Sequence, residues 1–163
     1  MFWGAFNSFR RTNLIPLFGD SDAPRKGVTS VQILNCLQEN LPTIAEPDSI
    51  FMQDNAPTHK AERVQVWLNN WARENGIELL KWPPYSLDLN PIENAWKILK
   101  HRICKHYPEL ADLPKNNQSK EKLIQAAIFE WDTITDGMFD ILSISMAHRL
   151  QAVILANGWY TKY

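Results

Sequence analysis

Short apolar runs and longer amphipathic segments follow one another along the chain, and they predict strands and helices in turn. Two apolar runs at 1–6 and 12–17, separated by a polar turn, predict a β-hairpin. A run at 49–53 predicts a buried strand that stops at Asp54, and 77–81 predicts a further short strand. Apolar residues recur at helical spacing in the remaining segments, which predicts helices at 28–41, 59–75, 91–107, 119–133 and 145–156.

The order of these elements predicts an α/β fold with helices at its C-terminal end. Strand 49–54, helix 59–75 and strand 77–81 follow one another, which predicts parallel pairing through a right-handed crossover. The segment 108–119 contains two prolines and two asparagines and is typical of a connection. We therefore divide the chain into a core at 1–107 and a helical extension of the same domain at 108–163. A length of 163 residues with 45% apolar residues suits one compact domain.

Two carboxylates stand at places where a sheet of this kind binds ligands. Asp54 follows the third strand, and Glu93 lies in the first turn of a helix that Asn90 caps and Pro91 begins. Open α/β sheets bind ligands at the carboxyl ends of their strands, so the pair can supply hard oxygen ligands to Mg²⁺ or Mn²⁺. Each residue also has a plainer interpretation. Glu93 can be part of a capping box, and Asp54 can form an Asx turn that leaves the strand.

Three motifs of the chain stand in the same order as in a known family. They are 53–57 (QDNAP), 82–84 (WPP) and 88–94 (DLNPIEN). With them the sequence resembles the catalytic core of the Tc/mariner transposases, eukaryotic DDE recombinases with an RNase H-like fold. Residues 2–6 resemble the family's second strand, and 145–149 with 158–163 resemble its C-terminal signature. The departures are Leu87 in place of Pro, Ala147-His148 in place of Pro-Arg, and 38 residues between the two carboxylates, a few more than most members have.

The resemblance implies that Asp54 and Glu93 are catalytic and metal-binding, as the second and third members of a carboxylate triad. In the intact family site the triad holds two Mg²⁺ or Mn²⁺ ions. The family's first catalytic Asp lies on a strand ahead of the segment that resembles 2–6, and this chain begins after that point. We therefore expect weak or single-ion binding, and lost or severely reduced activity in this chain by itself.

The resemblance also implies an RNase H-like fold whose mixed sheet is incomplete because its first strand is missing. In such sheets the first strand lies between the second strand and the strand that carries the second carboxylate. The edges at 1–6 and 50–54 would then lack their shared partner. Three outcomes are open: the two edges pair directly, a gap stays between them, or another segment, a second copy or a partner chain fills it.

The net charge of the chain and the local arrangement of its cations point in different directions on DNA binding. The formal net charge of −1 does not by itself indicate a DNA-binding protein. Four cations nevertheless fall within one predicted helix and without an intervening acid: Lys97, Lys100, Arg102 and Lys105. This helix can contact DNA phosphates, or it can be an ordinary solvated surface. No stretch approaches the roughly 18 apolar residues of a membrane span, so we expect no membrane partner.

Two functional hypotheses follow. In the first, the chain is a partial catalytic domain of a Tc/mariner-like DDE transposase, which acts in the nucleus on the DNA of transposon ends and targets and is inactive as this chain. In the second, it is a non-catalytic DNA- or protein-binding module derived from such a transposase. Metal-dependent DNA nicking that disappears in Asp54→Ala favours the first.

Overall fold

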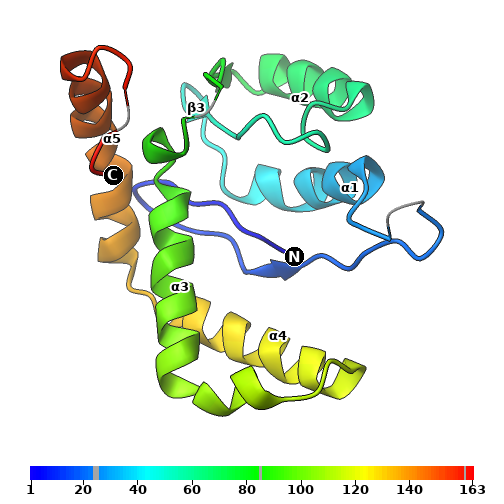
Figure 1. The fold of residues 1–163 in the computed structure, drawn as a ribbon. Coiled ribbons are helices and arrows are strands. Elements are labelled where there is room, and N and C mark those ends of the chain that lie inside the picture. The colour runs from blue at the N-terminus through cyan, green and yellow to red at the C-terminus, as the bar shows by residue number, and fades with distance from the viewer. Residues whose placement is uncertain (24–25, 85, 160) are drawn as a thin grey trace.

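The computed structural model describes residues 1–23, 26–84, 86–159 and 161–163. Figure 1 shows short strands flanked by longer helices. The strands are β1 (Phe2–Trp3), β2 (Ile15–Pro16), β3 (Ile50–Phe51) and β4 (Glu78–Leu79). The α-helices are α1 (Ser30–Asn40), α2 (Glu62–Glu74), α3 (Ile92–His106), α4 (Asn117–Asp132) and α5 (Asp136–Leu155). Single 3₁₀ turns lie at η1 (Leu41–Thr43), η2 (Leu87–Leu89) and η3 (Pro108–Asp112).

The N-terminal hairpin forms as the sequence predicts. Strands β1 and β2 are antiparallel, with Phe2 opposite Pro16 and Trp3 opposite Ile15. The turn is closed by Asn7, whose Oδ1 accepts the backbone N–H groups of residues 9 and 10 at 2.8 and 2.9 Å. Asparagine favours such turns because its side chain replaces a backbone acceptor.

The strand–helix–strand unit also agrees with the prediction. Strands β3 and β4 are parallel, with Ile50 opposite Glu78, and α2 forms the crossover between them. Helix α2 is followed by Gly76 at φ +66°, a left-handed conformation that a glycine adopts without steric cost. The Gly76 carbonyl accepts the N–H of Asp48 at 2.8 Å, which ties the end of the crossover to the start of β3.

Within the described residues the four strands form two separate sheets, β1–β2 and β3–β4. A cavity of about 540 Å³ lies between them and is lined by 1–8 from the hairpin and by 49–54 from the β3 segment. The expected break in the sheet beside β3 is therefore present, and it takes the form of an open gap. Figure 1 shows the β3 segment well separated from the hairpin.

The two strands that flank the gap direct backbone groups into it. Met1 exchanges two hydrogen bonds with Leu17, and Ala5 accepts one from the N–H of Thr12. Because successive residues of a strand direct their N–H and C=O groups to opposite edges, those of residues 2, 4 and 6 point away from β2. On β3, the carbonyls of Ser49 and Phe51 accept from the β4 side, so residues 50 and 52 point away from β4.

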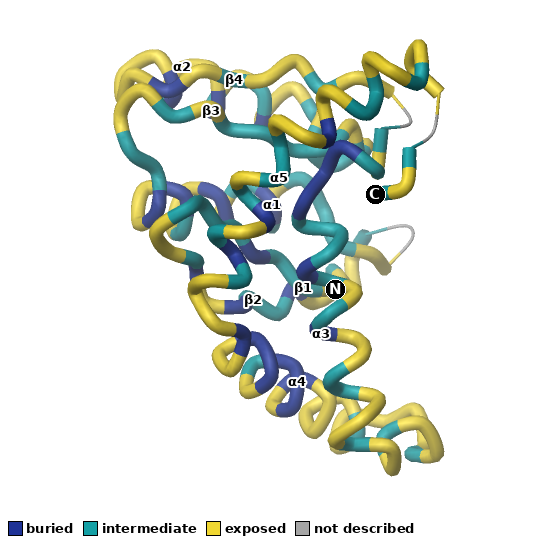
Figure 2. Tube along the Cα trace, turned by 90° about the vertical axis from the view of Figure 1, so that its left-hand side faces the viewer, coloured by how far each residue is buried: buried dark blue, intermediate teal, exposed yellow. Residues whose placement is uncertain are grey.

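Helices cover the hairpin on both sides and form two hydrophobic clusters. One cluster joins β2 to α1, η1 and α2 through Leu17, Ile33, Cys36, Leu37, Leu41, Ile44, Val64 and Leu68. The other joins the hairpin to α3, α4 and α5 through Leu14, Ala95, Leu99, Ala127, Trp131, Ile134, Phe139 and Leu142. Figure 2 shows buried chain where the helices meet the hairpin and exposed chain along their outer sides. The C-terminal helices thus share a core with the N-terminal hairpin.

The starts of the last two helices differ from the prediction. The N-cap of α4 is Asn116, whose side chain accepts the N–H of Ser119, and not Ser119 itself. Helix α5 begins at Asp136, nine residues before Ser145, with Thr135 as its N-cap, and it continues without interruption to Leu155. The predicted start at Ser145 is wrong because the Ser145 hydroxyl does not cap a helix end. It donates to the Leu142 carbonyl at 2.6 Å inside the helix.

The buried side of α5 carries an arginine beside apolar residues. Phe139, Leu142 and Arg149 are buried, whereas Leu150 and Ile154 are 49% and 73% exposed. By length and composition alone, α5 is also long and apolar enough to cross a membrane, which corrects the expectation that no segment is. A buried arginine that bonds to the rest of the domain indicates instead that α5 packs against this domain.

Candidate active site

Asp54 lies just beyond β3, in a turn that holds its carboxylate from two sides. Its Oδ1 accepts the backbone N–H of Ala56 at 3.0 Å, which is the Asx turn that the sequence allowed. The same oxygen lies 2.6 Å from Nδ1 of His59. An ionised carboxylate can only accept, so this bond places the imidazole proton on Nδ1. The Asp54 side chain stays 39% exposed, and it therefore remains accessible to a ligand.

Glu93 lies in the first turn of α3, as predicted, although the helix begins one residue later than expected. Helix α3 runs from Ile92, and Pro91 occupies the N-cap position. Asn90 still satisfies the first turn, because its Oδ1 accepts the N–H of Ile92 at 3.4 Å and its carbonyl accepts the N–H of Glu93 at 3.1 Å. Asn90 is buried, which fixes the position from which the helix starts.

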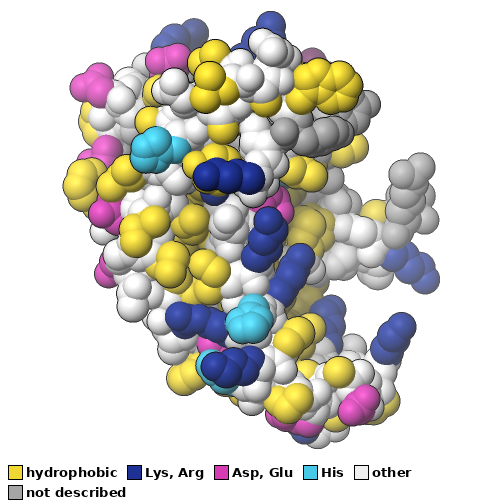
Figure 3. Space-filling model, turned by 60° about the vertical axis from the view of Figure 1, so that its left-hand side comes forward, with side chains coloured by type: hydrophobic (Ala, Val, Ile, Leu, Met, Phe, Trp, Pro, Cys, Tyr) yellow, Lys and Arg dark blue, Asp and Glu magenta, His cyan; other side chains and the backbone are white. Residues whose placement is uncertain are grey.

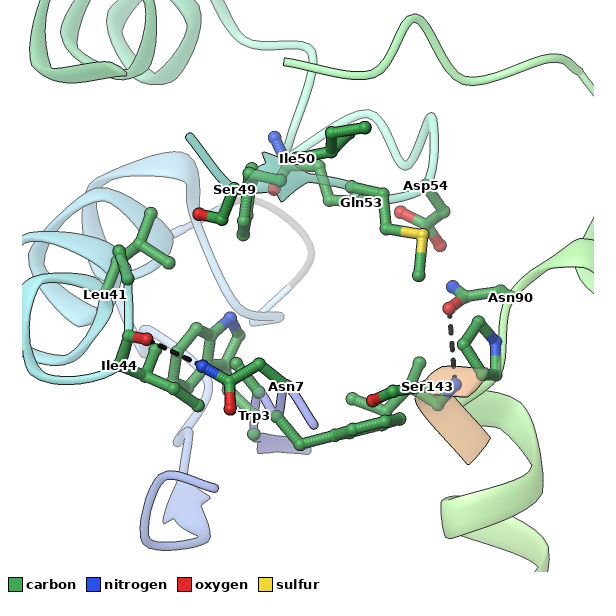
Figure 4. A pocket seen from close by; sticks show the side chains of 18 of the residues that line it. Trp3, Asn7, Leu41, Ile44, Ser49, Ile50, Gln53, Asp54, Asn90 and Ser143 are labelled. Carbon is green, nitrogen blue, oxygen red and sulfur yellow. Dashed lines mark hydrogen bonds between the residues drawn. The ribbon is translucent and has the colours of Figure 1, made fainter. Parts of the chain in front are cut away.

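The structure brings Asp54 and Glu93 to the same cavity, the one that separates the two sheets. Figure 4 shows Asp54 and Asn90 at the same end of it. The loop before α3 is tied to the turn after β3, because Asn55 donates from Nδ2 to the Trp82 carbonyl at 3.0 Å. A strand end and a helix start, 38 residues apart in sequence, therefore line one space.

The donor set at this end of the cavity suits a hard cation. Asp54 and Glu93 are its acidic lining residues, and the Asn90 amide lies beside them. Carboxylate and amide oxygens are ligands that Mg²⁺ accepts, and this ion is often held by one or two carboxylates and several waters. The described residues contain no cluster of three or more His, Cys, Asp or Glu side chains placed to hold a metal. These ligands therefore suit one weakly bound metal ion and are too few to hold two metal ions.

Sequence reasoning missed His59. The residue lies five positions after Asp54, and the turn at 56–60 folds its ring back onto the carboxylate. The carbonyl of His59 also accepts from Gln65 Nε2 at 2.8 Å, which anchors the turn on α2. The signal was the compact Asp-Asn-Ala-Pro-Thr-His segment, in which a tight turn returns the sixth residue to the first.

The four cations of α3 do not act as one group. Lys97, Lys100 and Lys105 are exposed, whereas Arg102 is half-buried and donates from Nη1 to Thr133 Oγ1 of the α4 end at 2.8 Å. Figure 3 shows Lys, Arg and His side chains running down one face of the molecule. Three of the four side chains predicted to contact DNA phosphates therefore face solvent.

A second groove, of about 450 Å³, lies where α3 meets the end of α4. Its buried acid is Glu130, 2% exposed, whose Oε1 lies 2.7 Å from His106 Nδ1. Thr133 donates its hydroxyl to the Glu130 carbonyl at 2.8 Å. The His106 contact gives the buried carboxylate a partner and links α3 to α4, so we assign the pair a structural role.

The family model of the DDE superfamily endonucleases matches residues 25–113, which is more than half of the chain. The chain belongs to the DDE superfamily endonucleases.

This chain has relatives among the transposases of nematodes. It is 38% identical over 114 residues to the transposable element Tc1 transposase of Caenorhabditis elegans, covering 70% of this chain and 37% of the relative. It is 29% identical over 163 residues to the Tcb2 transposase of Caenorhabditis briggsae, covering 100% of this chain and 54% of the relative. The DDE endonuclease chain therefore spans about half or less of the length of these curated relatives.

Solved structures of the Mos1 transposase catalytic domain share the fold of the DDE endonuclease chain. One, described as the catalytic domain of Mos1 mariner transposase, superposes with a TM-score of 0.59 at 19% identity and covers 99% of this chain and 82% of the other. Another, described as that domain with Raltegravir and Mn, gives a TM-score of 0.60 at 18% identity and the same coverage. The RNase H-like fold and the Tc/mariner resemblance predicted from the sequence are both confirmed.

Proposed function

We propose that this chain is part of the catalytic domain of a Tc/mariner-like transposase whose whole protein cleaves DNA and joins its strands with divalent metal. The observation that carries the proposal is the placement of Asp54 and Glu93 on one cavity in a DDE endonuclease. Asp54 comes from a strand end and Glu93 from a helix start, which is where α/β sheets bind ligands. DNA, as transposon ends and target, is the proposed substrate, and the nucleus is the proposed location.

The metal that this site would take is Mg²⁺ or Mn²⁺, held by Asp54 and Glu93. When bound, such ions activate an attacking water or 3′-hydroxyl and stabilise the leaving oxygen. The protein's own contribution is to fix the two carboxylates. His59 and the Ala56 amide orient the carboxylate of Asp54, and the buried Asn90 sets the start of α3 that carries Glu93.

The third carboxylate has a natural place in this geometry. The cavity between β1 and β3 is bordered by backbone groups on both sides and by apolar side chains, and Asp54 lies at one end of it. An extended segment in that gap would pair with both edges, and a carboxylate at its end would join Asp54 and Glu93. We propose that the segment comes from elsewhere in the transposase or from a partner copy, and that the chain alone is inactive or nearly so.

DNA binding is proposed for the exposed cations of α3. Lys97, Lys100 and Lys105 lie on the helix that begins beside Glu93, so a duplex along this helix would reach the cavity end where the carboxylates lie. Each lysine would neutralise one backbone phosphate, and the affinity would fall steeply with salt. The contact is independent of sequence, because phosphates position DNA without identifying its bases.

A second candidate function is a non-catalytic DNA- or protein-binding module. It is favoured by the small donor set, which lacks a third ligand within the described residues. This function would retain binding through α3 and would require no metal at the Asp54 end of the cavity.

A nicking assay separates the two functions. Supercoiled DNA would be incubated with Mn²⁺ and the chain, joined to a segment that carries the family's first Asp, and nicked circles would be counted. The transposase function predicts nicking that is lost in Asp54→Ala and in Glu93→Gln and retained in the control Asp20→Ala, whose carboxylate accepts the N–H of Asp22 within its own loop. DNA retention without nicking in every variant would support the binding module instead.

A further inference from the structure

The guanidinium of Arg149, on α5, is almost fully buried and is held by three hydrogen bonds. Arg149 is 1% exposed. It donates from Nη1 to the Asp88 carbonyl at 2.6 Å, from Nη2 to Asn94 Oδ1 at 3.1 Å and from Nε to Ser145 Oγ at 2.9 Å. Burial lowers the pKa of Arg149, and the neighbouring Tyr163 and Asp88 oppose that shift. A buried cation is tolerated only where its donors are satisfied, so these contacts form a fixed set.

Two of the three bonds lie on either side of Glu93. Asp88 belongs to η2, the turn before α3, and Asn94 follows Glu93 in the first helical turn. The guanidinium fork therefore spans the loop from its start to the first turn of the helix. Arg149 touches neither the cavity nor Glu93 itself, but the backbone that carries Glu93 cannot move without breaking its charge-assisted bonds.

The C-terminal residues close over the same contact. Thr161 donates both its backbone N–H and its hydroxyl to Asp88 Oδ2, at 3.1 and 2.9 Å. The Arg149 guanidinium lies 4.7 Å from the centre of the Tyr163 ring, which is cation–π distance. Asp88 is thus held through its carbonyl by α5 and through its carboxylate by the chain terminus.

We propose that Arg149 is a positioning residue for Glu93 and that Thr161 and Tyr163 form the latch that keeps it in place. Arg149 fixes the loop at 88–94, and the latch prevents Asp88 from turning away and excludes water from the guanidinium. The role of Glu93 as a metal ligand rests on the proposed function, whereas the mechanical link from the C-terminus to α3 does not.

The first test measures amide hydrogen exchange in the full chain and three variants. Deletion of 161–163 and Thr161→Ala release the latch without altering Arg149, and Lys162→Ala is the matched control because Lys162 is exposed and lies outside the bonds from Thr161 to Asp88 and the contact of Tyr163 with Arg149. We expect the deletion to speed exchange at 87–95 by about tenfold, in keeping with lost bonds to a charged group, and Thr161→Ala to do so less. Exchange in α4 should stay unchanged, as should every segment in Lys162→Ala.

The second test asks whether the link reaches the Glu93 site. Mn²⁺ affinity would be titrated by electron paramagnetic resonance in the same variants and in Arg149→Lys, whose single ammonium can satisfy one of the two loop contacts. The latch variants should bind Mn²⁺ several-fold more weakly than the parent, with Arg149→Lys less affected than Arg149→Met. If the parent chain binds no Mn²⁺, the proposed function fails. The hydrogen-exchange result then still shows whether the latch holds the loop at 88–94. Exchange at 87–95 that is unchanged on deletion, or that rises equally in α4, would overturn the proposal.

Discussion

His59 Nδ1 and Asp54 Oδ1 lie 2.6 Å apart, so the Asp54 carboxylate is oriented by a histidine from its own turn. The side chain of His59 is 19% exposed, and its backbone is anchored on α2 through Gln65. A partner of this kind fixes the direction of the carboxylate through Oδ1 and leaves its second oxygen available to a ligand. Loss of such partners typically weakens metal binding 10–100-fold.

Replacement of His59 should therefore weaken metal binding without removing a ligand. We expect His59→Ala to lower the Mn²⁺ affinity of the chain by about tenfold, because Asp54 would then rotate freely between its Asx bond and solvent. His59→Gln should lose less, since an amide N–H can still donate to the carboxylate. Titration by electron paramagnetic resonance checks both, with His148→Ala, an exposed histidine of α5, as control. If His59→Ala binds Mn²⁺ as tightly as the parent chain, the contact between His59 and Asp54 does not contribute to metal binding.

The sequence was sufficient to predict the carboxylates and most of the elements around them. Asp54 and Glu93 stand in motifs whose local chemistry, a strand that stops at an Asx turn and a helix that starts at Asn-Pro, is short-range. What the sequence could not predict depends on contacts between distant segments. No local pattern marks Arg149 for burial, which depends on bonds to distant residues such as the carbonyl of Asp88, 61 residues away. His59 was missed because a turn, and not a periodic pattern, returns it to Asp54.

The isolated chain should cleave DNA poorly. Two carboxylates on one cavity can hold a single Mg²⁺ or Mn²⁺ with waters, but the two-ion reaction needs a further ligand between them. We expect residues 1–163 to show neither nicking nor strand transfer above the Asp54→Ala background in Mn²⁺. Joining an upstream segment that carries the family's first Asp should be necessary for activity. Efficient strand transfer by purified 1–163 would contradict the incomplete-site interpretation.

The edges of the gap should exchange their amide hydrogens in an alternating pattern. In β1, the amide of Trp3 is bonded to β2 and should be slow, whereas residues 2, 4 and 6 face the gap and should be fast. In β3, residues 50 and 52 should exchange faster than Phe51. Residue-resolved exchange by NMR tests this pattern. Uniformly slow exchange at 1–6 and 50–54 in a monodisperse monomer would mean that the sheet is already complete.

The same experiment can report on strand addition. If the chain associates through these edges, exchange at residues 2, 4, 50 and 52 should slow as protein concentration rises. Exchange in α4, which lies outside the gap, serves as the internal control.

The cations of α3 should contribute unequally to DNA binding. Combined Lys97→Ala, Lys100→Ala and Lys105→Ala should reduce affinity for duplex DNA of any sequence and lower the slope of log affinity against log salt by about three. Arg102→Ala should change the slope little, because its guanidinium already donates to Thr133, and should instead reduce stability. Fluorescence anisotropy from 50 to 200 mM salt measures both. A triple variant with the parental slope would remove α3 from the DNA interface.

The packing of Gly4 against Trp131 gives a test of how the hairpin is joined to the C-terminal helices. Trp131 is fully buried, and its Nε1–H donates to the Thr12 carbonyl at 2.9 Å. A Cβ on Gly4 would lie 3.1 Å from Trp131 Cζ2, so Gly4→Ala must displace the indole and should cost about 1–3 kcal/mol. Trp131→Phe loses the hydrogen bond and leaves a void, at a cost of about 2–4 kcal/mol.

The two changes should not add, because the smaller ring vacates the space that the new methyl group needs. We expect the double variant to be more stable than the sum of the single effects predicts by about 1 kcal/mol. Gly137→Ala is the matched control, since a Cβ there meets no atom within 4 Å and alanine favours the helix it lies in. Guanidinium unfolding curves of the four members of the cycle supply the free energies. Strict additivity would mean that hairpin and α4 do not share a rigid contact at Gly4, and that the C-terminal helices form a separate folding unit.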